Sequence, residues 1–490
     1  MVEDVREWCG KDKDWMKTRQ RIEDIYGYAN FLGWCHVIPN HAIMIMALIY
    51  GANCFSTAMM IVNTAGRDTD CNSGNVGCLV ALMHGMSSFE GETDWRGPIA
   101  DRALISTADG GYSINNAARI AIDIANAGRR LSGEAPLPNP KNSAQFHFTL
   151  AGSVQGFQAV SPSAASVTVK QDVDDLNEPG LAIDVVNLEE GSGPIEVLTP
   201  TATPKDVVNM GTNYPLMASP LVYPGQKVTA ELGTSNQISA AFQVSLRIKV
   251  NTAEDGQDTM DSEAIWLNPG TLRQSLEWTI PDSMESQPIE AIGIAISAAG
   301  ESAAGTIWLK SLGWSGAPQM TLMRPQKGPS SFWDRSWVNG VDIWLEAMGV
   351  SVCIAQSKGE GIVSYGTREW TDYSLTASRL VIKIGGPSGV AIRVQGLNRY
   401  YALVFNEGKD SISLIKAKDE ERIELARVNY EWKLDNEYQI ALEAKEDMIR
   451  ARVGTAEVVA RDSEYLGGGL GLVVTDGSLS VDSIKIAPIV

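Results

Sequence analysis

The stretch EAPLPNPKN, residues 134–142, separates two parts of the chain that follow different sequence patterns. Its three prolines predict a stiff linker, because proline fixes the backbone and cannot donate a backbone hydrogen bond. Before the linker, apolar residues recur at the spacing of an amphipathic helix, and after it apolar and polar residues alternate as along a strand. The sequence therefore predicts a helical segment followed by β-structure.

The helical segment covers residues 1–133, and we expect it to be all-α. Helical spacing of apolar residues is clearest in residues 15–34, 40–66 and 113–131. Ser113 is predicted to cap the last of these helices, and Gly133 is predicted to end it.

Beyond the linker, the sequence predicts two antiparallel β-sandwiches, because many short alternating stretches are separated by Gly, Pro and Asn. A second linker, RPQKGPSS at residues 324–331, divides them. We therefore expect the first sandwich over residues 143–322 and the second over residues 332–490. Strands of the first are predicted at residues 146–152, 166–173, 181–188, 227–232, 242–250, 290–297 and 306–314. Strands of the second are predicted at residues 361–366, 373–384, 389–396, 400–406, 411–417, 438–445, 448–454, 469–474 and 482–488.

The overall charge excludes some classes of partner. The 490-residue chain carries a formal net charge of −19, and a nucleic-acid backbone or an anionic membrane surface repels a polyanion. No apolar run is long enough to span a bilayer, and the first residues lack the pattern of an export signal. We therefore predict neither a nucleic-acid partner nor a membrane span.

The six cysteines predict reduced and mostly buried thiols. None of them forms a CxxC pair, and only four histidines are present, so the sequence gives no pattern for a zinc site. A disulfide such as Cys9 with Cys35 remains open.

The helical segment contains one unusual polar stretch, TAGRDTDCNSGN at residues 64–75. Asp68 and Asp70 flank a threonine in it. In one interpretation Asp68 caps a helix and Asp70 is solvated. In the other, the two carboxylates bind a divalent cation, because magnesium prefers hard oxygen ligands.

With its neighbours HVIPNHAIMIMALIYG (residues 36–51) and GNVGCLVALMHG (residues 74–85), this stretch resembles the C-terminal half of the ADP-ribosylglycohydrolase family. The resemblance runs from about Trp8 to Leu131. It implies a pair of Mg²⁺ ions, with Asp68 and Asp70 matching metal-binding carboxylates. It also implies hydrolysis of a ribosyl-type or other glycosidic bond.

The stretch departs from the family pattern at Cys71, where the family places a Thr or Ser ligand and where a thiol is a poor magnesium ligand. Asn72 is a candidate for an amide-oxygen ligand or a substrate contact. Arg67 either reaches a substrate or is a solvated charge. His36 and Asn40 either line the same cleft or form a structural polar cluster.

The family's N-terminal half, which supplies further metal ligands and most of the catalytic groups, has no match upstream of Asp68. We therefore expect the chain to begin inside its catalytic domain, and the catalytic residues stay unknown.

The first predicted sandwich loosely resembles the jelly-roll modules of carbohydrate-active enzymes, through residues 146–160 (FHFTLAGSVQGFQAV), 223–232 (YPGQKVTAEL) and 305–316 (GTIWLKSLGWSG). Such modules stack aromatic rings on sugars. Candidate rings are Trp266, Trp278, Trp308, Trp314 and Tyr214, and the alternative is that each ring faces the core.

The second predicted sandwich is similar to concanavalin A-like sandwiches, through residues 361–382 (GIVSYGTREWTDYSLTASRLVI) and 389–406 (GVAIRVQGLNRYYALVFN). Outward-facing side chains among Arg393, Gln395, Arg399 and Tyr400 are candidates for a shallow glycan site. The alternative is that their polarity reflects only the alternation of a half-exposed sheet.

These observations favour a magnesium-dependent glycoside hydrolase with appended glycan-binding sandwiches, acting on a glycan or an ADP-ribosyl-type substrate. The alternative is a non-catalytic carbohydrate-binding protein that carries an incomplete hydrolase remnant. The β-modules favour an extracellular or envelope location, although localisation and oligomeric state stay open.

Overall fold

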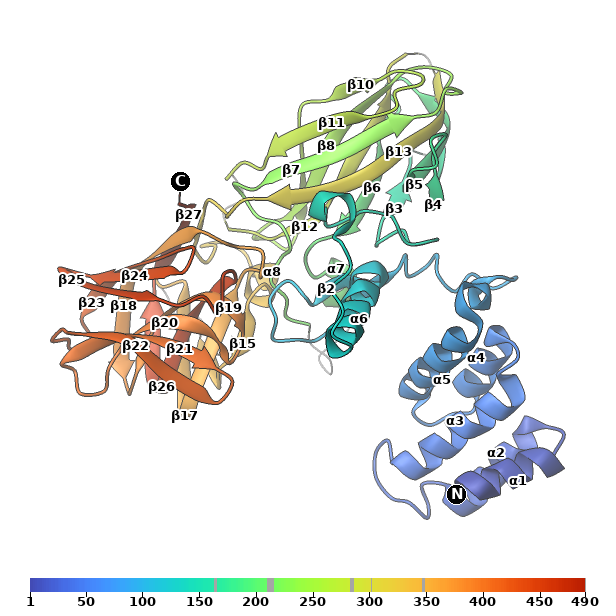
Figure 1. The fold of residues 1–490 in the computed structure, drawn as a ribbon, viewed down its shortest axis with the longest axis horizontal. Helices are drawn as coiled ribbons and strands as arrows, with labels where there is room; N and C mark the ends of the chain where they lie inside the picture. Colours follow the sequence, from blue (N-terminus) through green and yellow to red (C-terminus); the bar gives the residue numbers. More distant parts are fainter. Residues whose placement is uncertain (163–164, 209–215, 283–285, 301, 346–348, 490) are drawn as a thin grey trace. The chain divides into compact units, whose positions relative to one another are not determined.

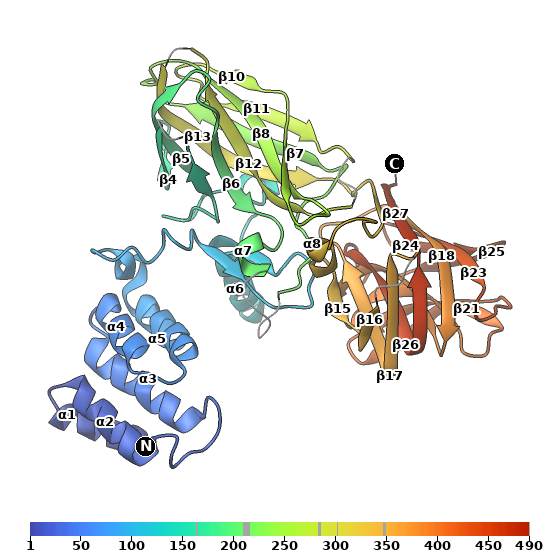
Figure 2. The same cartoon turned by 180° about the vertical axis from the view of Figure 1, so that it is seen from behind.

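The computed structural model describes residues 1–162, 165–208, 216–282, 286–300, 302–345 and 349–489. It divides into two compact units, Met1–Ile99 and Ala100–Val490, which Figures 1 and 2 show from opposite sides. The predicted fold class is confirmed: helices at the N-terminus are followed by antiparallel β-sandwiches. Across the described residues, no helix combines the length and apolarity that crossing a membrane requires.

The first unit is a bundle of helices. Its elements are α1 (Val2–Lys11), α2 (Trp15–Tyr26), α3 (Val37–Gly51), α4 (Phe55–Thr64), α5 (Thr69–His84) and the 3₁₀ helix η1 (Gly85–Phe89). The side chain of Asp14 caps α2 by accepting a hydrogen bond from the Met16 backbone N–H. The most apolar helix, α3, buries Ile43 and Met46 against its neighbours, which places the core of the unit around it.

The predicted helical stretch at residues 40–66 forms two helices, α3 and α4, separated by residues 52–54. A Cβ atom at Gly51 would lie 2.5 Å from the Cα of Ala58, so only glycine permits the two helices to approach this closely. This tight corner positions α4, and through α4 the polar stretch that precedes α5.

The second unit begins with a small hairpin and a helix. These are β1 (Arg102–Leu104), β2 (Ile114–Asn116) and α6 (Ala117–Leu131), followed by the 3₁₀ segment η2 (Pro140–Ser143). The helical segment predicted to residue 133 is thus divided between the two units. The predicted cap Ser113 is wrong, because the Asn116 side chain caps α6 by accepting from the Arg119 N–H at 3.0 Å.

The first sandwich has two antiparallel sheets among the described residues. One has the order β11–β7–β13–β5–β4 and consists of β4 (Ser166–Val173), β5 (Pro179–Glu189), β7 (Lys227–Thr234), β11 (Gln274–Thr279) and β13 (Ser302–Ser315). The other has the order β10–β8–β12–β6–β3 with β9 beside β8, and consists of β3 (Gln158–Val160), β6 (Ile195–Pro200), β8 (Phe242–Asn251), β9 (Gln257–Asp261), β10 (Ile265–Leu267) and β12 (Ile289–Ala298). A short helix, α7 (Lys205–Val208), follows β6.

The strand predicted at residues 146–152 is wrong. Only Phe146 pairs there, in an isolated bridge to Leu312. Phe148 has a left-handed backbone (φ 53°), which breaks an extended strand. The Gln155 side chain accepts hydrogen bonds from the backbone N–H groups of His147 and Phe148 at 2.8 and 2.7 Å, so these donors bond to a side chain instead of a neighbouring strand.

The second sandwich forms around one continuous antiparallel sheet. Its central order is β22–β21–β20–β19–β26–β18–β23–β24–β25, with β17 on β26 and β27 on β18. The strands are β14 (Met320–Leu322), β15 (Val338–Gly340), β16 (Ile343–Leu345), β17 (Val352–Tyr365), β18 (Tyr373–Ile384), β19 (Ser388–Gly396), β20 (Arg399–Phe405), β21 (Ser411–Lys418), β22 (Glu421–Asn429), β23 (Glu437–Lys445), β24 (Met448–Val453), β25 (Ala456–Arg461), β26 (Gly469–Val481) and β27 (Ser483–Pro488). Its core includes the fully buried rings of Trp333, Trp337 and Trp370.

The second predicted linker is packed against the first sandwich. We call residues 324–331 the strap; they lead into the helix α8 (Ser331–Arg335). The Ser330 N–H donates to the Ala253 carbonyl at 3.0 Å, and Ser331 donates to the Asp255 carboxylate through its N–H and its hydroxyl. The strap is therefore fixed to the turn between β8 and β9.

Candidate functional site

The predicted metal stretch lies at the turn from α4 into α5. Gly66 and Arg67 both have left-handed backbones (φ 79° and 71°), and this sharp turn starts α5 directly after Asp68. Asp68 occupies the N-cap position, yet its carboxylate makes no capping hydrogen bond to the helix. One ligand atom each of Asp68, Asp70 and Cys71 lies within 4.8 Å of the others.

Asn40 on α3 holds this turn in place. Its amide oxygen accepts from the backbone N–H of Asp68 at 3.3 Å and from the amide of Asn72 at 3.2 Å. Its amide nitrogen donates to the Tyr28 hydroxyl at 2.8 Å and to the His36 carbonyl at 3.1 Å. Asn40 and Asn72 are both buried, so they form a polar cluster that positions the backbone of Asp68.

His36 has a local structural role in the same cluster. Its Nδ1 accepts a hydrogen bond from the Ile38 N–H at 3.2 Å, and in this way the side chain caps α3. Its ring also lies 5.4 Å from the ring of Phe31. This geometry favours the structural interpretation of His36 over the cleft-lining one.

Arg67 is held by neighbouring side chains. Its guanidinium pairs with Glu23 and lies 4.7 Å from the centroid of the Tyr28 ring. Burial alone would raise the pKa of Glu23, but hydrogen bonds from Arg67 and Arg19 lower it below its ordinary value. The ion pair through Nη2 and the contact with the Tyr28 ring hold Arg67 at the turn.

Cys35 belongs to this site and was missed by the sequence analysis. Partial desolvation and a hydrogen bond to Asp68 raise the pKa of the Cys35 thiol, and repulsion from Asp68 and Asp70 raises the pKa of the Cys71 thiol. Both thiols therefore stay protonated near neutral pH. No local pattern indicates Cys35, because it precedes Asp68 by more than thirty residues and only the fold joins them.

Some, but not all, of the potential ligand groups of this cluster suit a magnesium ion. Asp68 and Asp70 supply carboxylate oxygens, which are the hard ligands that Mg²⁺ prefers. The protonated thiol of Cys71 is a poor ligand for this ion. Within the described residues, the two carboxylates are therefore the groups that would hold a magnesium ion.

The structure separates the aromatic candidates of the first sandwich. Trp266 on β10 is 53% exposed, whereas Trp314 is 8% exposed and packs against Phe146 at 5.9 Å. Trp308 is also buried, Trp278 is half-buried against the core, and Tyr214 lies outside the described residues. The exposed ring of Trp266 stays a candidate, while the burial of Trp314 contradicts its prediction as an open sugar platform.

The prediction of an outward-facing site with Arg393 and Tyr400 is wrong. Both side chains are fully buried. The Arg393 guanidinium donates to the carbonyls of Glu446 (2.6 Å) and Tyr465 (3.1 Å), and the Tyr400 hydroxyl donates to Glu360. Both side chains bond within the protein, and their burial makes them inaccessible to a glycan in this conformation.

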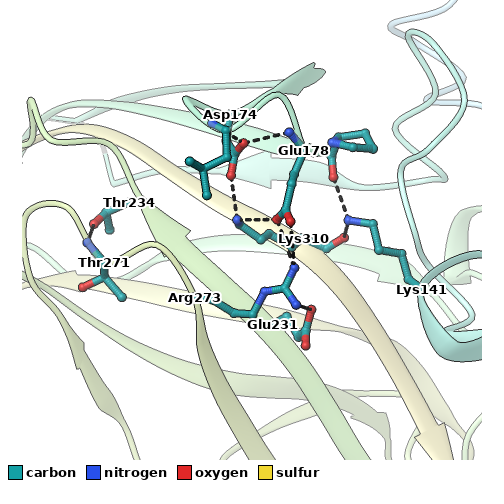
Figure 3. Close-up of polar contacts among 10 residues, drawn as sticks. Lys141, Asp174, Glu178, Glu231, Thr234, Thr271, Arg273 and Lys310 are labelled. Atoms are coloured by element: carbon teal, nitrogen blue, oxygen red, sulfur yellow. Dashed lines mark hydrogen bonds and ion pairs between the residues drawn. The ribbon is translucent and has the colours of Figure 1, made fainter.

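The sandwiches also contain a buried ionic network around Lys310 on β13, which Figure 3 shows. Lys310 is 2% exposed and donates to Asp174 at 2.6 Å and to Glu178 at 2.9 Å. Arg273 adds a second cation at 3.0 Å from Glu178. We name these residues the Lys310 network; each charge in it has a partner.

Residues 1–128 match the family model ADP-ribosylglycohydrolase. The match includes Asp68, Asp70 and Cys71 and covers the first unit and most of α6. No curated protein matches the chain.

The β-sandwiches are similar to several solved structures at low identity. A carbohydrate-binding module, CBM66 from Bacillus subtilis, is 18% identical over 31% of this chain and 94% of that chain, with a TM-score of 0.28. A protein of unknown function with a galectin-like fold, also from Bacillus subtilis, is 13% identical over 35% of this chain and 96% of that chain, with a TM-score of 0.27. The GH43 BlXynB protein from Bacillus licheniformis is 10% identical over 70% of this chain and 66% of that chain, with a TM-score of 0.32. Similarities this low assign no ligand to this chain.

Proposed function

We propose that the chain takes part in magnesium-dependent hydrolysis of a ribosyl-type glycosidic bond, with Asp68 and Asp70 as metal ligands. The observation that carries the proposal is the convergence of Asp68, Asp70 and Cys71 within 4.8 Å at the start of α5. The match of residues 1–128, which include this cluster, to the ADP-ribosylglycohydrolase family model also supports the proposal.

Each residue of the site has a defined task in this proposal. A bound Mg²⁺ supplies charge stabilisation and orients the hydroxyl groups of a sugar. Asp68 and Asp70 present their carboxylates to the ion. Asn40 fixes the position of Asp68 through its backbone N–H and holds Asn72 beside it. Arg67 pairs with Glu23, and no ion pair of Arg67 with Asp68 or Asp70 is present among the described residues.

The proposal is tested by metal binding and by turnover on the full chain. Isothermal titration with Mg²⁺ should detect binding, and Asp68→Asn and Asp70→Asn should each weaken it by about tenfold or more, or about 1.4 kcal/mol. Asp24→Asn is the matched control, because Asp24 is an exposed carboxylate on α2 that bonds to Gln20. Release of ADP-ribose from an ADP-ribosylated peptide should require added Mg²⁺.

A second candidate function is that of a carbohydrate-binding protein in which the helical unit serves as a scaffold. The exposed ring of Trp266 on β10 favours it, because an exposed aromatic ring offers a surface on which a sugar can stack. Saccharide binding without turnover at any Mg²⁺ concentration would support this second function and exclude the first.

A further inference from the structure

The second unit contains a pocket of about 300 Å³ that is lined by α6, by residues 143–147 and by Trp314 on β13. This volume is at the lower end of the range of roughly 300–1,000 Å³ for small-molecule sites. Hydrogen bonds fix the wall that residues 143–147 form. The Gln145 amide donates to the Trp314 carbonyl at 3.1 Å and accepts from the Trp314 N–H at 2.9 Å. This wall is therefore attached to the sheet of the first sandwich.

Hydrogen bonds also fix the wall that α6 forms. The Asp101 carboxylate accepts from the Val154 N–H at 2.7 Å, and the Asp101 carbonyl accepts from the Ala117 N–H at 2.9 Å. Further along the helix, the Asn126 side chain accepts from the Leu137 N–H at 2.8 Å. The helix is thus attached to the loop before β3 and to the linker that follows it. The pocket is therefore a built feature of the fold.

One buried side chain of the lining has an unused hydrogen-bond donor. His147 is 4% exposed, and its Nδ1 accepts from the Thr149 N–H at 3.2 Å. Burial and the nearby Lys141 lower the pKa of His147, so the ring is neutral near neutral pH and its proton lies on Nε2. This Nε2 has no partner among the described residues, and it is not one of the unpartnered polar atoms that are fully enclosed. The N–H of His147 therefore reaches the pocket and is free to donate to a ligand.

The same pocket combines a further donor with apolar surface. Arg119 donates to the Gly111 carbonyl at 3.1 Å, and its other N–H groups make no hydrogen bond among the described residues. The side chains of Ile114, Phe146 and Leu221 supply apolar lining. Donors beside apolar surface favour a ligand in which an accepting oxygen lies next to an apolar group.

The charges of the lining favour a neutral ligand that carries hydroxyl groups. Asp123 and Glu369 supply two carboxylates against the one guanidinium of Arg119, so an anionic ligand is disfavoured. Both carboxylates are exposed and accept hydrogen bonds. Asp123 uses one oxygen to accept from the Tyr112 hydroxyl at 2.9 Å, which leaves its other oxygen for a ligand.

We propose that this pocket binds a neutral acetamido sugar, whose acetamido carbonyl accepts from the Nε2–H of His147. The methyl group packs against Ile114 and Phe146, and the sugar hydroxyls donate to Asp123 and Glu369. An acetamido group joins an accepting oxygen to an apolar methyl, which a plain hexose lacks. This inference rests on carbohydrate binding, the second candidate function, and it requires neither the metal cluster nor catalysis.

The test is direct binding to the full chain by isothermal titration. The probes are N-acetylglucosamine and N-acetylgalactosamine, and glucose is the reference because it lacks the acetamido group. At least one of the two acetamido sugars should bind about tenfold more tightly than glucose, because only it accepts a hydrogen bond from the buried donor through a carbonyl.

Two variants and a matched control test the position of the site. His147→Phe keeps a ring of similar size but removes the donor, and it should lower the affinity by about tenfold. Ile122→Trp places a larger ring in the pocket from α6 and should abolish binding. Ile124→Trp is the control and should bind like the wild type, because Ile124 lies on the same helix, is 67% exposed and is outside the lining.

Several outcomes would overturn the inference. One is that neither acetamido sugar binds more tightly than glucose; another is that Ile122→Trp binds like the wild type while circular dichroism shows it folded. Ile122 is half-buried on a helix surface, so its variant tests the pocket even if His147→Phe impairs folding.

The inference and the proposed hydrolase fail in different ways. Binding of an acetamido sugar should persist in EDTA and in Asp68→Asn, and such binding without turnover would exclude the hydrolase while supporting this pocket. Binding of glucose oligomers that Ile122→Trp leaves intact would support the second candidate function at another site and would overturn this pocket.

Discussion

Two charged clusters of this protein differ in whether their charges are paired: the Lys310 network and the carboxylates at the start of α5. In the Lys310 network, a lysine that is 2% exposed pairs with Asp174 and Glu178, and the charges neutralise one another within the protein (Figure 3). At the start of α5, Asp68 and Asp70 lie close together, and no ion pair to either carboxylate is present among the described residues. The charges of the first cluster are therefore balanced within the protein, whereas no cation among the described residues balances the carboxylates of the second. Under the proposed function, this unbalanced negative charge binds the metal ion.

Removing the central cation of the Lys310 network should have the largest effect on stability. Lys310→Met leaves Asp174 and Glu178 without their buried partner, and breaking a buried pair in this way costs about 3–5 kcal/mol of unfolding free energy. Urea denaturation followed by tryptophan fluorescence measures this loss. Lys227→Met is the control, because Lys227 and Glu277 form an exposed pair that contributes at most about 1 kcal/mol. Equal effects of the two substitutions would contradict the distinction between the clusters.

Adding Mg²⁺ should have the next largest effect. A magnesium ion at one hundred times its dissociation constant stabilises the folded helical unit by about 2.7 kcal/mol, if it binds only the folded state. Thermal denaturation with and without Mg²⁺ measures this shift. The shift should disappear in Asp70→Asn and persist in Lys310→Met, provided that the latter variant is folded. A shift that survives Asp70→Asn would place the ion elsewhere.

Acidic pH should weaken the ion pairs of the Lys310 network. Although burial alone would raise the pKa of Asp174, its bond from Lys310 lowers that pKa, and bonds from Lys310 and Arg273 lower the pKa of Glu178. A carboxyl group whose pKa is lower in the folded state than in the unfolded state stabilises the fold. Its stabilising contribution is fully present at pH values above the unfolded-state pKa of about 4. The contribution is lost as the pH falls through the folded-state pKa. Unfolding free energies measured between pH 7 and pH 3 should therefore fall more steeply for the wild type than for Lys310→Met. Parallel curves would show that the network has no role in acid sensitivity.

Replacing the thiol of Cys71, beside Asp68 and Asp70, should have the smallest effect. Cys71→Ser exchanges a soft donor for a hydroxyl oxygen, so Mg²⁺ affinity should rise by roughly threefold. Isothermal titration measures the change, and Cys54→Ser, which alters a thiol in the same unit, is the control. An unchanged affinity would show that residue 71 does not contact the ion.

Much of the fold could be predicted from the sequence, because periodicity is a local signal. The three helical stretches and most strands follow directly from the spacing of apolar residues. The strand predicted at residues 146–152 failed because the Gln155 side chain binds the backbone there, a contact that no period reveals. Asp68 and Asp70 were accessible to sequence reasoning as a pair, whereas Cys35 was not, since only the packing of α3 beside α5 brings it to them.

The sequence by itself determined the order of helices and strands, and it placed Asp68 and Asp70 together at the start of a helix. The boundary between the two compact units lies between Ile99 and Ala100, away from both proline-containing stretches, and only packing decided it. Only the tertiary structure decided which polar side chains face solvent. Arg393 has a left-handed backbone (φ 55°) at a register shift between β19 and β26, and Lys310 lies at a similar shift between β13 and β7. At such bulges the alternation of inward and outward side chains is interrupted, so both cations are buried where a simple strand pattern does not place them. Whether a charge is buried and paired or exposed and open depends on such contacts between distant strands, which local sequence does not specify.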